Sequence, residues 1–143
     1  MKIKVILISL ILLASQSAYA ENQWSIGGGF QNAGLIGVQY GYVEDDQKYY
    51  AAIGLVGVAV GYERVVSDDK KHALGVVTGI IPVAADKGYL LATYNYHFSG
   101  FYKSGFQLGV NMGLRRDDGV VLLGPNREPD TQFSMGLSLA YKF

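Results

Sequence analysis

The chain has 143 residues, its 12 lysines and arginines are balanced by 12 aspartates and glutamates, and it contains no cysteine. Balanced charge argues against a nucleic-acid partner, because proteins that bind nucleic acid carry a basic excess. The lack of cysteine excludes a disulfide framework, a thiolate metal site and a cysteine nucleophile. The two histidines, His72 and His97, lie in separate segments, so we expect neither a multi-histidine metal centre nor a cofactor.

The first twenty residues have the three parts of a secretory signal peptide. Lys2 and Lys4 precede an apolar run over 5–14, and Ala18-Tyr19-Ala20 forms a small-residue cleavage site. The run is shorter than the roughly 20 residues that a membrane-spanning helix needs. A buried helix is the alternative, but the sequence shows no second helix for it to pack against. We therefore expect a cleaved leader over 1–20 and one domain over 21–143.

Beyond the leader, apolar residues alternate with small or polar ones, which is the period of a β-strand. The polar segments between these runs, such as 44–47, 67–71 and 99–104, predict turns. The uncharged stretch 49–62 contains no clear turn. Its outward apolar positions are odd-numbered up to Leu55 and even-numbered from Val58, and this change of parity predicts a tight hairpin near 55–58. The pattern predicts a turn over 82–88 and the longest connection over 116–131. Eight strands result, over 24–30, 36–42, 49–55, 58–62, 74–80, 90–98, 106–114 and 133–143.

The last strand is the clearest element of the sequence. Its alternate residues from Phe133 to Phe143 are all apolar, whereas the residues between them are small or polar. The glycines, serines and alanines on the weaker face of this and other strands suit a cramped interior better than a surface in contact with water. Most charges fall in the turns, as expected where a charge facing lipid costs roughly 2–4 kcal/mol.

These features predict an all-β fold, an eight-stranded antiparallel up-and-down transmembrane β-barrel with its apolar face outward. A soluble barrel of the lipocalin type, with its apolar face inward, is the alternative. If the chain starts in the periplasm, the aromatic residues near the lower strand ends form an interfacial girdle. We expect this girdle to comprise Trp24, Tyr40, Tyr42, Tyr49, Tyr62, Tyr94, Tyr96, Phe98, Phe106, Tyr141 and Phe143.

Leader, eight strands and terminal aromatic together resemble the small eight-stranded bacterial outer-membrane β-barrel proteins, a family of adhesins, envelope-anchoring barrels and lipid A-modifying enzymes. The resemblance implies a Gram-negative cell envelope, a monomer in the outer membrane, and contact with outer-membrane lipid and lipopolysaccharide. It also implies insertion by the barrel assembly machinery through Phe143. Basic residues on the outer side could touch lipopolysaccharide phosphates, although acidic residues share their loops. These basic residues are Lys87, Arg115, Arg116 and Arg127.

Polar residues on the inward face form a candidate lumen network. An eight-stranded barrel is just wide enough for its own side chains to fill it. We therefore expect Glu63 to pair with Lys142 or Arg115, with amides bridging them, and we do not favour a conducting pore. The predicted set is Gln39, Glu63, Thr93, Asn95, His97, Gln107, Asn111, Arg115, Ser134, Ser138 and Lys142.

His97 and Glu63, with Ser99 or Ser138 as nucleophile, raise the alternative of acid–base catalysis. The lipid A deacylases have a histidine followed directly by serine, whereas Phe98 separates His97 from Ser99 here. The lipid A palmitoyltransferases have adjacent Asp-Ser, whereas this chain has Ser67-Asp68 in a turn. No catalytic residue is assigned. The expected function is that of a non-enzymatic barrel acting in envelope structure or in surface and lipid interaction through its outer loops, with a lipid A-modifying enzyme as the alternative and a narrow pore as a third.

Overall fold

The structure is a computed structural model that describes residues 21–82, 85–117, 128 and 130–143. The predicted leader over 1–20 and most of the predicted connection over 116–131 lie outside the described residues. Among the residues that the structure describes, no helix is both long enough and apolar enough to cross a membrane.

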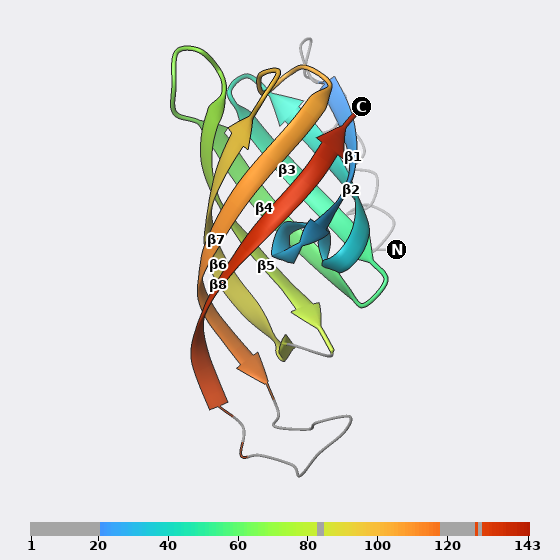
Figure 1. Cartoon of the computed structure of the whole chain (residues 1–143), viewed down its shortest axis with the longest axis vertical. Coiled ribbons are helices and arrows are strands. Elements are labelled where there is room, and N and C mark those ends of the chain that lie inside the picture. Colours follow the sequence, from blue (N-terminus) through green and yellow to red (C-terminus); the bar gives the residue numbers. More distant parts are fainter. Residues whose placement is uncertain (1–20, 83–84, 118–127, 129) are drawn as a thin grey trace, which may run out of the picture.

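Eight antiparallel strands form one closed barrel in which each strand pairs with its neighbours in sequence and β8 returns to β1 (Figure 1). This confirms the predicted eight-stranded up-and-down barrel. A short 3-10 helix, η1 (Phe30–Asn32), interrupts the first hairpin. The strands are β1 (Glu21–Gly29), β2 (Gly34–Glu44), β3 (Gln47–Gly54), β4 (Gly57–Val65), β5 (His72–Ile81), β6 (Ala85–His97), β7 (Gly105–Asp117) and β8 (Asp130–Lys142).

The uncharged stretch 49–62 is a hairpin, as its parity change predicts. Gly54 at the end of β3 pairs with Gly57 at the start of β4, which leaves Leu55 and Val56 as the turn. The side chain of Leu55 is 78% exposed. A hairpin tip with no polar side chain is unusual on a surface in contact with water, where turns carry Asn, Asp and Ser.

The structure extends most strands beyond their predicted bounds, and three places show why. The predicted turn over 82–88 is wrong in extent, because β6 already begins at Ala85. β7 continues to Asp117 and β8 begins at Asp130, so the connection predicted over 116–131 is shorter. Backbone pairing continues beyond the end of the apolar alternation, because every strand residue gains by satisfying its N–H and C=O groups. Phe30 belongs to η1 and not to the first strand, since Gly29, with a φ of 102°, turns the chain inward.

The two faces of the wall have opposite character. Apolar side chains cover the outside, and several are largely exposed, such as Ile53 at 72% and Leu137 at 69%. Among the largest fully buried side chains are instead Lys48, Glu63 and Lys142. The apolar alternation therefore lies on the outer surface, as the sequence predicts, and these three charged side chains lie inside.

The wall is uneven in height. β6, β7 and β8 have 13 residues each, whereas β3 has 8 and β4 has 9. In Figure 1 the long strands continue at the bottom of the view, past the level of η1 and of the β3–β4 turn. One side of this rim, formed by the β1–β2 and β3–β4 hairpins, is consequently low, and we call it the short rim.

Candidate functional site: a filled, charged lumen

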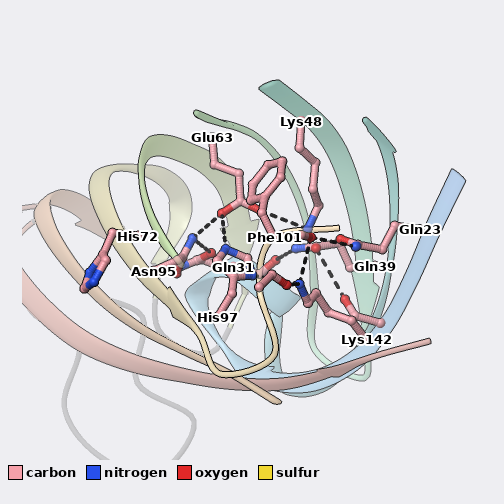
Figure 2. Close-up of polar contacts among 12 residues, drawn as sticks. Gln23, Gln31, Gln39, Lys48, Glu63, His72, Asn95, His97, Phe101 and Lys142 are labelled. Carbon is pink, nitrogen blue, oxygen red and sulfur yellow. Dashed lines mark hydrogen bonds and ion pairs between the residues drawn. The ribbon is translucent and has the colours of Figure 1, made fainter. Parts of the chain in front are cut away.

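A buried cluster of ionisable groups occupies the lumen (Figure 2). Lys48 and Glu63 face each other in the register of β3 and β4, and Lys48 Nζ lies 2.9 Å from Glu63 Oε1. Glu63 Oε2 lies 3.7 Å from His97 Nε2, and His97 Nδ1 lies 2.9 Å from Lys142 Nζ. The four side chains are at most 1% exposed, so the carboxylate sits between an ammonium and an imidazole without access to solvent.

The expected pairing of Glu63 with Lys142 or Arg115 is not what the structure shows, because Lys48 takes that place. Residues directly opposite on adjacent strands share a face with closely spaced Cβ atoms, which favours Lys48. Lys142 instead donates hydrogen bonds to the carbonyl oxygens of Gly100 and Phe101, both at 2.9 Å. Arg115 is half-buried and lies near the far end of the barrel, where it pairs with Tyr89 and Gln132.

Amide side chains extend the cluster along the barrel. Asn95 donates to Glu63 Oε2 at 2.5 Å and exchanges two hydrogen bonds with Gln31, at 2.8 and 3.0 Å. Gln31 also donates to Asn111, whose amide donates to the Ser138 hydroxyl. The expected bridging amides are therefore present, but the central one, Gln31, comes from η1. The segment around Gln31 has the composition of an exposed polar turn, so the sequence does not predict that Gln31 is buried.

The lumen is blocked at two levels. η1 folds into the barrel with Gln31 and Asn32 each 1% exposed. At the opposite end the β6–β7 loop inserts Phe101, which is 1% exposed and packs its ring against His97 at 5.1 Å. Gln23 holds this loop by donating to the Phe101 carbonyl. The other predicted lumen residues are buried in the same interior, namely Gln39, Thr93, Gln107, Ser134 and Ser138.

A carboxylate, an imidazole and an ammonium in line form an acid–base arrangement in principle. In this barrel the three groups contact one another and the backbone, and their burial leaves no path for a substrate to His97. Ser138 accepts its hydrogen bond from Asn111, and Ser99 is exposed. In the described part of the chain, no group of three or more His, Asp or Glu side chains could hold a metal ion. The arrangement is suited to holding the wall together.

Aromatic rings form a belt around the end of the barrel where β1 begins and β8 ends. Trp24 packs against Tyr40 at 4.9 Å between ring centroids, and Tyr49 packs against Tyr62 at 5.1 Å. Tyr141 contacts both Phe106 and Phe143, at 5.0 and 5.4 Å. The remaining predicted members, Tyr42, Tyr94, Tyr96 and Phe98, lie on β2 and around the β6 end near the same edge.

His72 belongs to this aromatic belt and not to the lumen. Its Nδ1 lies 2.6 Å from the Tyr94 hydroxyl, and its ring packs against Tyr96 at 5.2 Å. Figure 2 shows it on the wall, apart from the cluster around Glu63. The two histidines therefore have separate roles, as their separation in sequence indicates.

Three turns at the same end are tied together outside the lumen. Asp46 forms an ion pair with Lys70 at 2.9 Å and accepts a hydrogen bond from the Tyr102 hydroxyl. The Tyr102 hydrogen bond, followed by that of Lys70, lowers the pKa of Asp46 below its usual value. Burial and the bond to Asp46 raise the pKa of Tyr102 to about 12. This polar cluster holds together the three turns at the end of the barrel next to the aromatic belt.

Comparison with known proteins adds no relative: no family model, no curated protein and no solved structure matches the chain. Functional conclusions therefore depend on the geometry of the barrel itself.

Proposed function

We propose that the chain is a non-enzymatic β-barrel of the Gram-negative outer membrane, acting in envelope structure or in lipid and surface contact through its outer face and loops. The observation that carries this proposal is the inverted distribution of side chains. Apolar residues cover the outer wall, and three charged side chains of the strands, Lys48, Glu63 and Lys142, are buried in a closed interior. A barrel in water has the reverse arrangement.

The outer wall supports the proposal in detail. Val60, Val76 and Leu108, from three different strands, are between 41% and 54% exposed, so the apolar surface continues around the barrel. Soluble monomers rarely expose a contiguous apolar patch of more than a few hundred Å². The aromatic belt closes one edge of this surface, and Trp and Tyr prefer the membrane interface because a ring enters the acyl chains while its polar atom reaches water.

The filled lumen favours a structural role over transport. Two insertions, η1 and the Phe101 loop, cross the interior at separate levels, and hydrogen bonds link them to the wall. A buried network of this kind stabilises one geometry and leaves no aqueous path along the axis. We therefore expect the protein to show no discrete conductance in planar bilayers.

The ends of the chain are consistent with the proposed location. In this proposal the predicted leader over 1–20 would direct export, and the barrel assembly machinery would engage the exposed Phe143 ring at the end of β8. On the opposite side, Lys87, Arg115 and Arg116 lie near the far ends of β6 and β7 and are positioned for lipopolysaccharide phosphates. Arg127 lies outside the described residues. We expect a monomer, because β8 returns to β1 and the barrel closes on itself.

Heat-modifiable gel migration of the membrane-extracted protein tests the proposal directly. A membrane barrel resists dodecyl sulfate until it is boiled, so the unboiled band should migrate faster than the boiled one, and the protein should sediment with the outer-membrane fraction. Recovery of the folded protein from the periplasm without detergent would contradict the proposal. Deletion of 118–127, outside the barrel strands, should abolish a surface-binding phenotype while migration remains heat-modifiable.

The enzyme alternative has its own test. Lipid A from cells with and without the protein is compared by mass spectrometry. We expect identical spectra, and a mass difference equal to one acyl chain would favour a lipid A-modifying enzyme instead.

A further inference from the structure

The barrel wall has a lateral opening next to the β1–β8 seam, on the side away from the aromatic belt. Among the described residues, β1 and β8 pair at only four positions, from Ser25 with Lys142 to Gly28 with Leu139. β7 and β8, by contrast, pair over the whole of both strands, from Gly105 with Lys142 to Asp117 with Asp130. The far half of β8 therefore has a described paired strand on one side only.

The unpaired part of β8 presents backbone hydrogen-bonding groups to the opening. The Phe143 N–H donates to the Trp24 carbonyl, which shows that Phe143 and its alternate residues direct their backbone groups toward β1. Beyond the last pair, this set continues to Met135 and Phe133. Their N–H and C=O groups face the opening, and their side chains point outward and are 63% and 65% exposed.

An apolar groove of about 460 Å³ lies between this edge of β8 and the short rim. A second, shallower groove of about 290 Å³ follows the β1–β8 seam toward the aromatic belt, and the two share Leu35. Together they form a track along the seam from Tyr141 to the opening. The larger groove is lined by Gly29, Phe30, Leu35, Val56, Ile81 and Leu137.

A cationic group, Arg115, follows behind Tyr89, which packs against the groove residue Phe30. Phe30 packs edge-on against Tyr89 at 5.1 Å, and Tyr89 pairs in register with Arg115. Adjacent residues on one face of a sheet have Cβ atoms about 5 Å apart, so Arg115 is the next inward side chain beyond Tyr89. The Nε atom of Arg115 is buried and makes no hydrogen bond within the described structure.

The low wall opens at the depth of the acyl chains. A transmembrane strand needs about 9 to 11 residues, but from Tyr49, in the aromatic belt, β3 extends only to its end at Gly54 on the short rim. β8, in contrast, continues to Asp130. Hydrocarbon could fill the groove but could not hydrogen-bond to the β8 backbone groups that face the opening or to Arg115. An amphiphile could satisfy both, with its chain in the groove and its polar end at the opening.

From this geometry we propose that the track holds one acyl chain of a phosphate-bearing lipid drawn from the surrounding leaflet, with the phosphate beside Arg115. The inference rests on the proposed membrane location and names a specific lipid site within it. The apolar lining selects the chain, the edge of β8 meets the ester and glycerol oxygens, and the guanidinium meets the phosphate.

The test uses the full mature chain, folded in phosphatidylcholine vesicles that contain a small fraction of phosphatidylglycerol with a diazirine halfway along one acyl chain. After illumination, mass spectrometry maps the labelled residues. We expect labelling at Phe30, Leu35, Val56 and Leu137 to exceed that at Val60 and Val76 by at least about fivefold, equivalent to roughly 1 kcal/mol of preference. Even labelling around the barrel would overturn the inference, whereas failure to fold into vesicles would instead overturn the membrane location.

Two variants and a second probe define the site. Val56→Trp should fill the groove and remove the excess labelling, while Val60→Trp, on the outward face of β4, should leave it unchanged. Arg115→Gln should reduce labelling by the phosphatidylglycerol probe to the level given by a diacylglycerol with the same chain. Heat-modifiable migration verifies that each variant is folded. Cross-linking of β8 to a second copy at the same residues would show that the opening is a protein interface and would also overturn the inference.

Discussion

Lys48 and Glu63 face each other across β3 and β4 with 2.9 Å between ammonium and carboxylate, and both side chains are almost completely buried. Lys142 lies in the same interior, where its partners are the His97 ring and two backbone carbonyls. The only carboxylate of this buried cluster therefore stands between two lysines. Its position makes Glu63 the residue on which the interior depends most.

Glu63→Ala should destabilise the barrel by about 3–5 kcal/mol, because it leaves Lys48 buried without a counter-charge. Lys48→Met should cost a similar amount, and the double variant Lys48→Met with Glu63→Ala should cost less than the sum of the two. Trp24 is the single tryptophan, so its fluorescence reports urea unfolding in vesicles. Asp68→Ala, in an exposed turn, is the control and should change stability by no more than about 0.5 kcal/mol. Additive costs in the double variant would contradict the pairing.

Lys142→Met should release the β6–β7 loop, because the two hydrogen bonds to the carbonyls of Gly100 and Phe101 are lost. The readout is limited proteolysis with trypsin, since Lys103 in this loop is exposed. Cleavage after Lys103 should accelerate several-fold, as expected when hydrogen bonds from a charged donor worth about 1.5–3 kcal/mol are removed. Cleavage after the exposed Arg116, at the opposite end of the barrel, serves as the internal reference. Equal acceleration at both sites would indicate general unfolding and not release of the loop.

Val76→Arg and Val66→Arg form a matched pair that distinguishes lipid from water outside the wall. Val76 is 48% exposed in the middle of β5, and Val66 is 54% exposed in the loop after β4. In a membrane, arginine at the first position should cost roughly 2–4 kcal/mol, while the second should be nearly neutral. Unfolding in vesicles measures both. Nearly neutral effects at both positions would mean that water, and not lipid, surrounds the wall.

The turn cluster should loosen in acid. The pKa of Asp46 is lowered in the folded protein, so its contribution to stability is complete above the unfolded-state pKa and is lost as the pH falls through the folded-state value. The affected range therefore lies below about pH 4. Tyr102→Phe removes the largest cause and should raise the Asp46 pKa toward its ordinary value, as measured by carboxyl carbon NMR titration. Tyr40→Phe, whose hydroxyl bonds to Asn22 and not to Asp46, should leave the Asp46 pKa unchanged in the same spectra.

Much of the barrel is predictable because strand period and side-chain size are local properties of the sequence. The parity change near Leu55 predicts the β3–β4 hairpin without any charged turn residue. Glycine on the inward face at positions such as Gly41 and Gly75 also has a physical reason, because a Cβ there would lie 2.6 Å from the Lys48 side chain and 2.0 Å from the Tyr62 carbonyl oxygen. Residues of this kind report the size of the lumen.

The interior contacts were harder to predict, since they depend on where loops go. Gln31 and Asn32 have the composition of an exposed turn, yet η1 carries them into the lumen, and Phe101 enters from a loop that reads as polar. Lys48 was the omission that parity could have corrected. It precedes the outward-facing Tyr49, so strand period alone places it inside, opposite Glu63.

The brevity of the β1–β8 pairing also determines how the molecule assembles and comes apart. Every other ladder joins consecutive strands, so each hairpin can form locally at a small cost in chain entropy. The last ladder joins residues as distant in sequence as Ser25 and Lys142 over four positions only. We expect such a junction to form late in folding and to open first in unfolding. The β1–β8 ladder, and not the charged interior, would then limit the lifetime of the folded barrel.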